Sequence, residues 1–298
     1  MPANIEQWWI DTYEENVLHA LQQKDSRLSG CVSPGTMKGK RRRFNYLGEA
    51  EMSEMTGRNE DTVWTDDEFF NRWITARRFA KSSIIEDEDV MRAFTEPNSD
   101  LVQAAVFAGR RQKDKVIIEA MDAVAYTGED AETAVPLPDS QKLDVQIGSP
   151  YGAPANTGMN LEKILEAKFL LDDADIDDDI PRFYTVTATQ LKELLNTTEI
   201  KNADYNNVKA LAEGKIDTFA GFKFIRVSSK IIPWANNIRV NFAWARDCVK
   251  FAVSKDIHTK CAELPAKNFN LGVQTRMRVG AVRLFDKGVV YVPCAEVH

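Results

Sequence analysis

The sequence lacks the patterns by which most enzymes and metal-binding proteins are recognised. It contains no GxSxG, GxxxxGKS or GxGxxG segment, and its three histidines form no HExxH pair. His258 lies in a segment of strand-like composition, and we interpret it as structural. We therefore expect no catalytic residue, no cofactor and no metal ligand, and we expect that the protein is not an enzyme.

Cysteine is scarce and scattered along the chain. No two cysteines form a CxxC pair or show a zinc-ligand spacing. The four are Cys31, Cys248, Cys261 and Cys294. Such a pattern is typical of free thiols in a reducing cytoplasm, so we predict no disulfide.

Long apolar runs and an excess of positive charge are also missing. No run of 18 apolar residues is present, so no transmembrane helix and no membrane partner are expected. The first residues carry acids where a signal peptide carries bases. The formal net charge of −7 argues against a dedicated DNA-binding protein but leaves room for a local basic face. The 298 residues are enough for one large domain or two small ones.

The longest pattern that is present predicts a single helix over residues 97–126. Pro97 and Asn98 provide a start signal, and Gly128 provides a stop signal. Apolar residues gather at both ends, whereas the centre is charged. The charged residues are Arg110, Arg111, Lys113, Asp114 and Lys115. A core helix is rarely built this way, so we predict a strut that is anchored at both ends and shows its centre to solvent or to a partner.

Residues 4–23 also show apolar side chains at helical spacing. This amphipathic segment carries Trp8 and Trp9 side by side. It can pack on its own domain, or it can be an arm whose two tryptophans dock on a neighbouring subunit. Both interpretations stay open.

Residues 41–85 predict a two-stranded ribbon with a polar tip. The strand-like arms lie near residues 44–47 and 73–79, and the tip between them is highly charged. Two strands alone are marginal in water, so another subunit is the natural support for this ribbon. The tip residues Arg58, Glu60 and Asp61 are our candidates for an intersubunit contact. The basic run at residues 38–43 is either a solvated turn or a contact for phosphate or an acidic partner.

The second half alternates short helices and strands, which indicates an α+β fold. Asn160 is expected to cap one helix, and Thr187 and Gln190 fit a capping box that opens another. Strands are expected near residues 183–186, 219–227 and 238–244, and a helix over residues 245–254. The turn chemistry at residues 286–288 predicts a closing hairpin between strands at residues 273–281 and 289–292.

An acidic run over residues 172–179 is the strongest candidate for a metal site. Asp173, Asp175 and Asp177 match the start of a calcium-binding EF-hand loop. However, Asp178 stands where that loop needs glycine, and Tyr184 stands where it needs glutamate. We interpret the run as a solvated loop and assign no metal ligand.

The order of segments in the second half resembles that of tailed-bacteriophage major capsid proteins. The segments are IPRFYTVTATQLKELL, ALAEGKIDTFAGFKFIRVSSKI, FAWARDCVKFAVSKDI and VGAVRLFDKGVVYVPC. In that family a strand and a short helix precede a Gly-Lys-Ile turn and a GFxxxxS strand, and a DxVxxAV segment and a GAxR hairpin follow. The matching residues are Arg182, Leu191, Leu195, Gly214, Ile216, Gly221, Phe222, Ser228, Asp247, Val249, Gly280, Ala281, Arg283, Gly288 and Val289.

The resemblance implies a fold with five parts. These are an N-terminal arm (1–30), an extended β-ribbon loop with the lead-in to the spine helix (31–96), a peripheral domain with the spine helix (97–150), an axial domain (151–237), and a return to the peripheral domain with a closing hairpin (238–298). Since the extended loop starts by about residue 40, no room is left before it for a fused scaffolding segment, so a separate scaffolding protein is implied.

The implied function is structural. The protein would self-assemble through hexamers and pentamers into an icosahedral shell around phage double-stranded DNA, held without sequence specificity, with a portal protein as a further partner. It would be assembled in the host cytoplasm and reside in the virion. The charged helix centre, with Arg110, Arg111, Lys113 and Lys115, would face the shell interior. The alternatives are an encapsulin-like shell that holds cargo and, from a different class, a metal-dependent binding or hydrolytic domain that uses the acidic loop.

Overall fold

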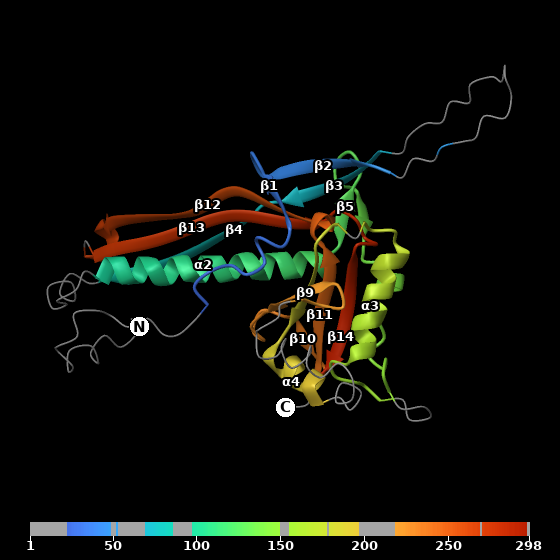
Figure 1. The fold of residues 1–298 in the computed structure, drawn as a ribbon. Coiled ribbons are helices and arrows are strands. Elements are labelled where there is room, and N and C mark those ends of the chain that lie inside the picture. The colour runs from blue at the N-terminus through green and yellow to red at the C-terminus, as the bar shows by residue number, and fades with distance from the viewer. Residues whose placement is uncertain are drawn as a thin grey trace, which may run out of the picture.

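The structure is a computed structural model in which most of the chain can be described. The described residues are 23–48, 52, 69–85, 97–149, 155–177, 179–196, 218–268 and 270–296. They form a mixed α+β fold with three sheets. A long helix and its four-stranded sheet stand beside a six-stranded sheet with two helices (Figure 1).

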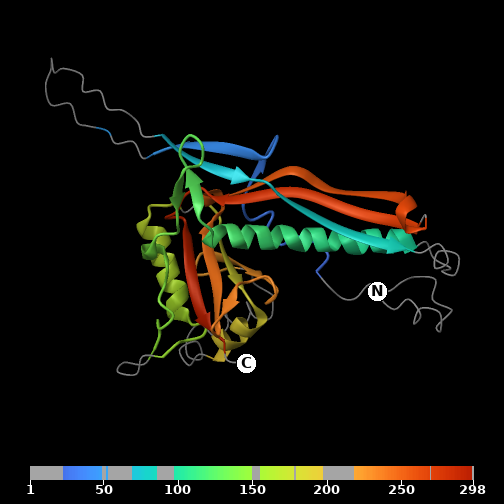
Figure 2. The same ribbon diagram turned by 180° about the vertical axis from the view of Figure 1, so that it is seen from behind.

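The long helix is α2 (Pro97–Asp122), which confirms the predicted spine. It runs along one face of a long sheet in which three strands are antiparallel and a short fourth strand is parallel to its neighbour, as Figures 1 and 2 show from opposite sides. The helix ends at Asp122 rather than at residue 126, because residues 125–127 form strand β5 and Ala125 is buried in a small core beneath the ribbon. No helix among the described residues is long and apolar enough to cross a membrane.

The long sheet has four strands. In order across the sheet they are β1 (Ser33–Thr36), β12 (Val249–Leu264), β13 (Asn270–Arg283) and β4 (Arg77–Ile85). The 3-10 turn η5 (Pro265–Lys267) joins β12 to β13. Met277 and Val279 of β13 are buried on the side of α2, and Ile257 of β12 lies close to Gly109 of the helix.

Two expectations for this region were wrong. Residues 245–254 form no helix: the 3-10 turn η4 (Arg246–Cys248) leads directly into β12, which pairs with β13 over its whole length. The closing hairpin is also absent from the fold, because β13 pairs with β12 and β4, whereas β14 (Val289–Ala295) pairs with β11 of another sheet.

The ribbon belongs to a second sheet of four short strands. In order they are β2 (Arg41–Leu47), β3 (Phe69–Thr75), β5 (Ala125–Thr127) and β6 (Thr133–Val135). The antiparallel pairing of β2 with β3, from Arg41 opposite Thr75 to Leu47 opposite Phe69, confirms the predicted ribbon. The predicted second arm is divided, since β3 ends at Thr75 and β4 joins the long sheet.

The third sheet has six strands. They are β7 (Arg182–Val186), β8 (Thr218–Phe219), β9 (Phe222–Arg226), β10 (Trp234–Ala235), β11 (Ile238–Ala245) and β14. The helix α3 (Leu161–Asp173) packs against β14 and β11, α4 (Ala188–Asn196) follows β7, and the 3-10 turn η2 (Asp139–Gln141) contacts β14. Residues 238–296 thus supply strands to both large sheets. The five-part division of the chain stays a prediction.

Two predicted caps are confirmed at atomic detail. The Asn160 side chain accepts a hydrogen bond from the backbone N–H of Lys163 at 2.9 Å and so starts α3. Thr187 and Gln190 form a reciprocal capping box: the Thr187 N–H donates to Gln190 Oε1 at 2.9 Å, and the Gln190 N–H donates to Thr187 Oγ1 at 3.4 Å.

Candidate assembly surfaces

The root of the ribbon is fixed by a buried arginine. The guanidinium of Arg283 donates to the carbonyls of Met121 and Ala123 at 2.8 and 3.2 Å, and so occupies the free carbonyl end of α2. It also pairs with Asp286 at 2.5 Å, and the second oxygen of that carboxylate pairs with Arg72 of β3 at 2.7 Å. The spine helix and the ribbon are therefore held together by one chain of charge-assisted bonds.

The inner half of the ribbon is covered by its own chain. Ile74 is fully buried, and the indole N–H of Trp73 donates to the carbonyl of Gly128 at 2.8 Å. The support that we expected from another subunit is therefore supplied, for this half, by the ribbon's own chain. The outer half differs: Leu47, Phe69 and Phe70 are 48 %, 77 % and 40 % exposed. On β2 and β3, the exposed large apolar side chains thus lie at the end that joins the acidic connection.

The charged centre of α2 holds another segment of the chain. The side chain of Asp114 is 1 % exposed, and its carboxylate accepts hydrogen bonds from four donor groups of residues that precede β1. The donors are Gln23 Nε2 (2.6 Å), Ser26 Oγ (2.6 Å), the Arg27 N–H (3.1 Å) and the Leu28 N–H (3.1 Å). The prediction that the centre of the helix faces solvent or a partner was therefore wrong for this residue.

The neighbouring basic residues are used in the same way. Arg110 and Arg111 donate to main-chain carbonyls of residues 23–24 at 3.2 and 3.0 Å. Lys113 forms an ion pair with a β12 carboxylate at 2.7 Å, and Lys115 is exposed and 3.9 Å from a carboxylate one turn further along α2. Much of the positive charge at the centre of the spine is thus already paired within the subunit.

The face of the long sheet that points away from α2 is strongly basic. Alternation along β4 and β13 places apolar side chains toward the helix and the following ones on the opposite face. In β12 a register shift between Lys255 and His258 brings both residues onto that opposite face, beside Arg278 and Arg276. We call this surface the basic face; its residues are Arg78, Lys255, His258, Lys260, Arg276 and Arg278. The acids of these three strands are Asp256, which pairs with Lys113 of α2, and Glu263, which lies in register with Leu271. Neither acid offsets the charge of the basic face.

The exposed run at residues 38–43 extends this surface. The Ser254 hydroxyl of β12 donates to the carbonyl of Gly39 at 3.4 Å, which places the run beside the basic face. Arg42 stacks on the ring of Phe44 at 4.7 Å, so part of this run is ordered on the ribbon. The basic face and residues 38–43 together therefore form a positively charged surface, although the whole chain carries a net negative charge.

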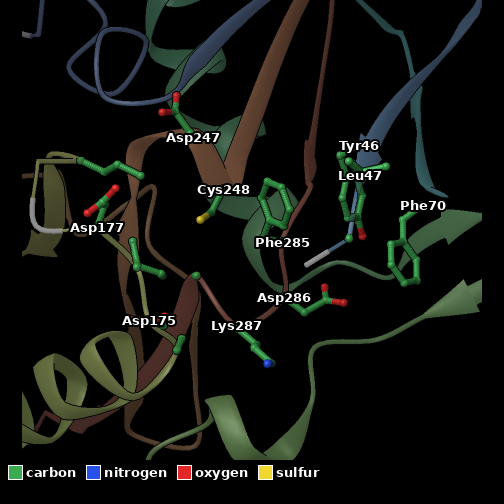
Figure 3. A pocket seen from close by; sticks show the side chains of 15 residues that line it. Tyr46, Leu47, Phe70, Asp175, Asp177, Asp247, Cys248, Phe285, Asp286 and Lys287 are labelled. Carbon is green, nitrogen blue, oxygen red and sulfur yellow. The ribbon is translucent and has the colours of Figure 1, made fainter. Parts of the chain in front are cut away.

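A cavity of about 780 Å³ opens beneath the outer half of the ribbon, beside Asp286 of the ion pairs at its root (Figure 3). Its walls come from the ribbon, the loop after α3, η4 and the turn before β14. The ring of Tyr46 lies 4.6 Å from that of Phe285 and 5.5 Å from that of Phe70, centroid to centroid, and gives the cavity an aromatic side. Asp175 and Asp177 stand on the opposite wall (Figure 3).

Trp8, Trp9, Arg58, Glu60 and Asp61 lie outside the described residues, so their contacts stay predictions.

In the acidic run, Asp172 forms an ion pair with the buried Arg182. Asp173, Asp175 and Asp177 are exposed. Among the described residues, no three His, Cys, Asp or Glu side chains converge in a way that holds a metal ion. The run is thus partly used as a structural partner of β7.

Thiol chemistry gives a direct test of the core. Cys31, Cys248 and Cys294 are free thiols, and burial raises the pKa of both Cys248 and Cys294 to about 12. At pH 8 the thiolate fraction of these two residues is about one in ten thousand. We expect iodoacetamide to leave both unmodified in the native protein and to label four thiols after unreduced denaturation, as read by mass spectrometry. A crosslinked pair would overturn the expectation.

The family model described as phage capsid protein matches residues 5–296 of this chain. The chain belongs to the phage capsid protein family. It is a structural major capsid protein, a subunit of the capsid shell of a virion. No curated protein sequence is significantly similar to it.

Solved capsid structures share the fold of this capsid protein at low sequence identity. The capsid of Ralstonia phage GP4 superposes with a TM-score of 0.72 at 11 % identity, covering 96 % of this chain and 95 % of that one. For cyanophage Pam1 the values are 0.69, 15 %, 95 % and 95 %. For Helicobacter pylori bacteriophage KHP30 they are 0.68, 11 %, 94 % and 94 %. Pairwise similarity at this level shows the fold.

Proposed function

We propose that this capsid protein builds an icosahedral shell around phage double-stranded DNA by laying the ribbon tip of each subunit over the basic face of the next. The observation that carries the proposal is a segregation of charge. Residues 49–68, which connect β2 to β3, contain eight Asp or Glu and one Arg. The basic face carries five Lys or Arg and no acid on the described strands.

The direction of the ribbon makes the proposed contact intermolecular. β2 and β3 lead away from the far ends of β12 and β13 (Figures 1 and 2). The ends of β2 and β3 that the acidic connection joins therefore lie away from the subunit's own basic face, and a second copy offers the complementary surface. Such head-to-tail contacts close into rings when the rotation between subunits allows it. Complementary charge then fixes register and selects the correct partner.

The same arrangement orients the spine. Because α2 covers the face of the long sheet opposite to the basic face, a ribbon on the outer surface places α2 toward the interior. Asp114, Glu119 and Asp122 lie among its cations and weaken attraction to packaged DNA, which suits binding without sequence specificity. A separate scaffolding protein, a portal protein and assembly in the host cytoplasm complete the proposal.

Expression of the protein with and without a scaffolding partner tests the proposal. Light scattering and electron microscopy should show rings or shells at high subunit concentration. Monomers under every condition would overturn the assembly model.

Charge reversal on the basic face should block assembly without unfolding the subunit. Lys255 and Arg276 are exposed, so Lys255→Glu with Arg276→Glu leaves the core intact. Each exposed pair is worth roughly 0.2–1 kcal/mol, and reversal adds repulsion to the lost attraction at every contact in the shell. We expect the subunit concentration needed for assembly to rise at least tenfold in sedimentation assays at low salt.

The matched control reverses two exposed lysines away from the basic face, Lys115→Glu with Lys230→Glu, and should assemble normally. Adding Glu60→Lys and Asp61→Lys to the blocked variant should restore part of the assembly. If the control is impaired equally, or if wild-type assembly does not weaken as salt screens the charges, the ribbon tip does not bind the basic face of the next subunit.

A further inference from the structure

We propose that the cavity beneath the outer half of the ribbon binds a basic segment of a second protein, with an aromatic or branched apolar side chain between Lys or Arg residues. The inference goes beyond the proposed contact between subunits, because the cavity lies apart from the basic face. Three features of the described residues carry it: the size and lining of the cavity, its charge, and its place beside the ion pairs that hold the ribbon.

The size and lining fit a few side chains of a peptide. A volume of about 780 Å³ falls within the range of sites that take small ligands or short segments. Tyr46, Phe70 and Phe285 present their rings to it, and Phe70 and Phe285 are 40 % and 38 % exposed. Aromatic surfaces of this kind gain free energy when an apolar side chain covers them.

The charge around the cavity selects a cationic partner. Asp175, Asp177 and Asp247 are exposed at its rim, whereas Lys287 is the one cation among its lining residues. Lys and Arg side chains of a bound segment can pair with these carboxylates, and an Arg can stack on Tyr46.

The longest segments outside the described residues have the wrong charge for this cavity. Residues 1–22 contain four acids and no Lys or Arg, residues 49–68 contain eight acids and one Arg, and residues 86–96 contain five acids and one Arg. Residues 197–217 contain four acids and three Lys. Placing any of these beside the rim carboxylates brings like charges together, so electrostatics favours a different protein as the occupant.

Binding here would act on the ribbon. Asp286 lines the cavity and also bridges Arg283 at the end of α2 and Arg72 of β3. A segment that spans the ribbon wall and the loop after α3 contacts both sides of this junction. It therefore stabilises the ribbon orientation in which both walls are in reach, since a ligand favours the state that it binds more tightly.

Fluorescence anisotropy with a labelled peptide tests the inference on assembled shells. The probe is fluorescein-labelled Lys-Arg-Trp-Leu-Lys-Arg, and its counterpart is Glu-Asp-Trp-Leu-Glu-Asp. We expect the basic peptide to bind and the acidic one not to bind. Asp175→Asn with Asp177→Asn should weaken binding roughly tenfold, as expected for two partly exposed ion pairs. The control double variant Glu166→Gln with Glu263→Gln removes the same charge elsewhere and should bind like the wild type.

Three results would overturn the inference: equal binding of both peptides, equal weakening in both double variants, or no effect of the Asp175 and Asp177 substitutions. Binding to dissociated subunits but not to shells would also overturn it, because a second copy of the capsid protein would then cover the cavity. Shell formation itself is read by electron microscopy in the same samples, so failure of the peptide to bind is distinguishable from failure to assemble.

Discussion

Replacing residues 50–66 with a short Gly-Ser turn should leave a folded subunit that no longer forms shells. The buried cores of the described residues lie elsewhere: around α2 and the long sheet, between α3 and the six-stranded sheet, and beneath the inner ribbon at Ile74. The replacement removes five of the eight acids of the tip connection while leaving β2 and β3 paired. Circular dichroism should show unchanged secondary structure and cooperative unfolding, whereas electron microscopy should show no shells.

The matched control is a Gly-Ser replacement of residues 129–132, the exposed turn between β5 and β6. This turn also carries acids, namely Glu129, Asp130 and Glu132, so it controls for a loss of negative charge. The control variant should assemble. Normal shells from the shortened ribbon would show that the tip is not an intersubunit clamp and that the function assigned to residues 49–68 is wrong.

The sequence predicted well those features that depend on neighbouring residues. The cap at Asn160 and the capping box at Thr187 need only side chains three residues apart, and both formed as expected. The ribbon between residues 41–47 and 69–75 was also recognised, because its two strands carry enough aromatic and branched residues to predict extended structure.

The features that it missed depend on distant partners. The turn at Asp286 forms as predicted. However, β13 pairs with β12 and β4 along its two edges, and β14 pairs with β11. Turn chemistry alone therefore predicted a hairpin that does not form. Residues 249–253 were predicted as helix although Val249, Phe251 and Val253 recur with a period of two. Their partner strand lies some 30 residues further along the chain, and tertiary pairing decides such short apolar runs.

The candidate surfaces were predicted only in part. The basic residues of the long sheet come from three strands, and only the pairing register brings Arg78, Lys255 and Arg276 onto one face. Arg283 was among the residues that match the resemblance. Its hydrogen bonds to the carbonyl end of α2 could not be predicted, because the two segments are distant in the sequence. One signal in the sequence was available for the centre of the spine: Asp114 is a single acid within a basic run, a pattern that indicates a specific partner rather than a solvated face.

Asp114→Asn should release the segment that precedes β1. The carboxylate accepts from the side chains of Gln23 and Ser26 and from the N–H groups of Arg27 and Leu28, of which the Leu28 bond is buried. The asparagine amide keeps one acceptor oxygen. Its NH2 group is itself a donor, so it cannot accept the hydrogen bonds that the second carboxylate oxygen accepts. Losing charged hydrogen bonds and leaving N–H groups unpaired should cost about 2–4 kcal/mol. Local opening of residues 23–28 should then become tens to several hundred times more frequent, since 1.4 kcal/mol is a factor of ten.

Limited trypsin digestion reads this opening directly, because Lys24 and Arg27 are cleavage sites within the segment. Cleavage there should accelerate strongly in Asp114→Asn while the rest of the subunit stays resistant. Asp122→Asn is the matched control, since Asp122 lies exposed near the end of the same helix. Trypsin should cleave this variant at the same rate as the wild-type protein. Unchanged cleavage in Asp114→Asn would mean that packing of Leu28 and Val32 in the core, and not the carboxylate, holds the segment on the spine. Because Arg110 and Arg111 bind the same segment, opening would also free two cations toward the shell interior, and non-specific DNA binding by the variant should rise.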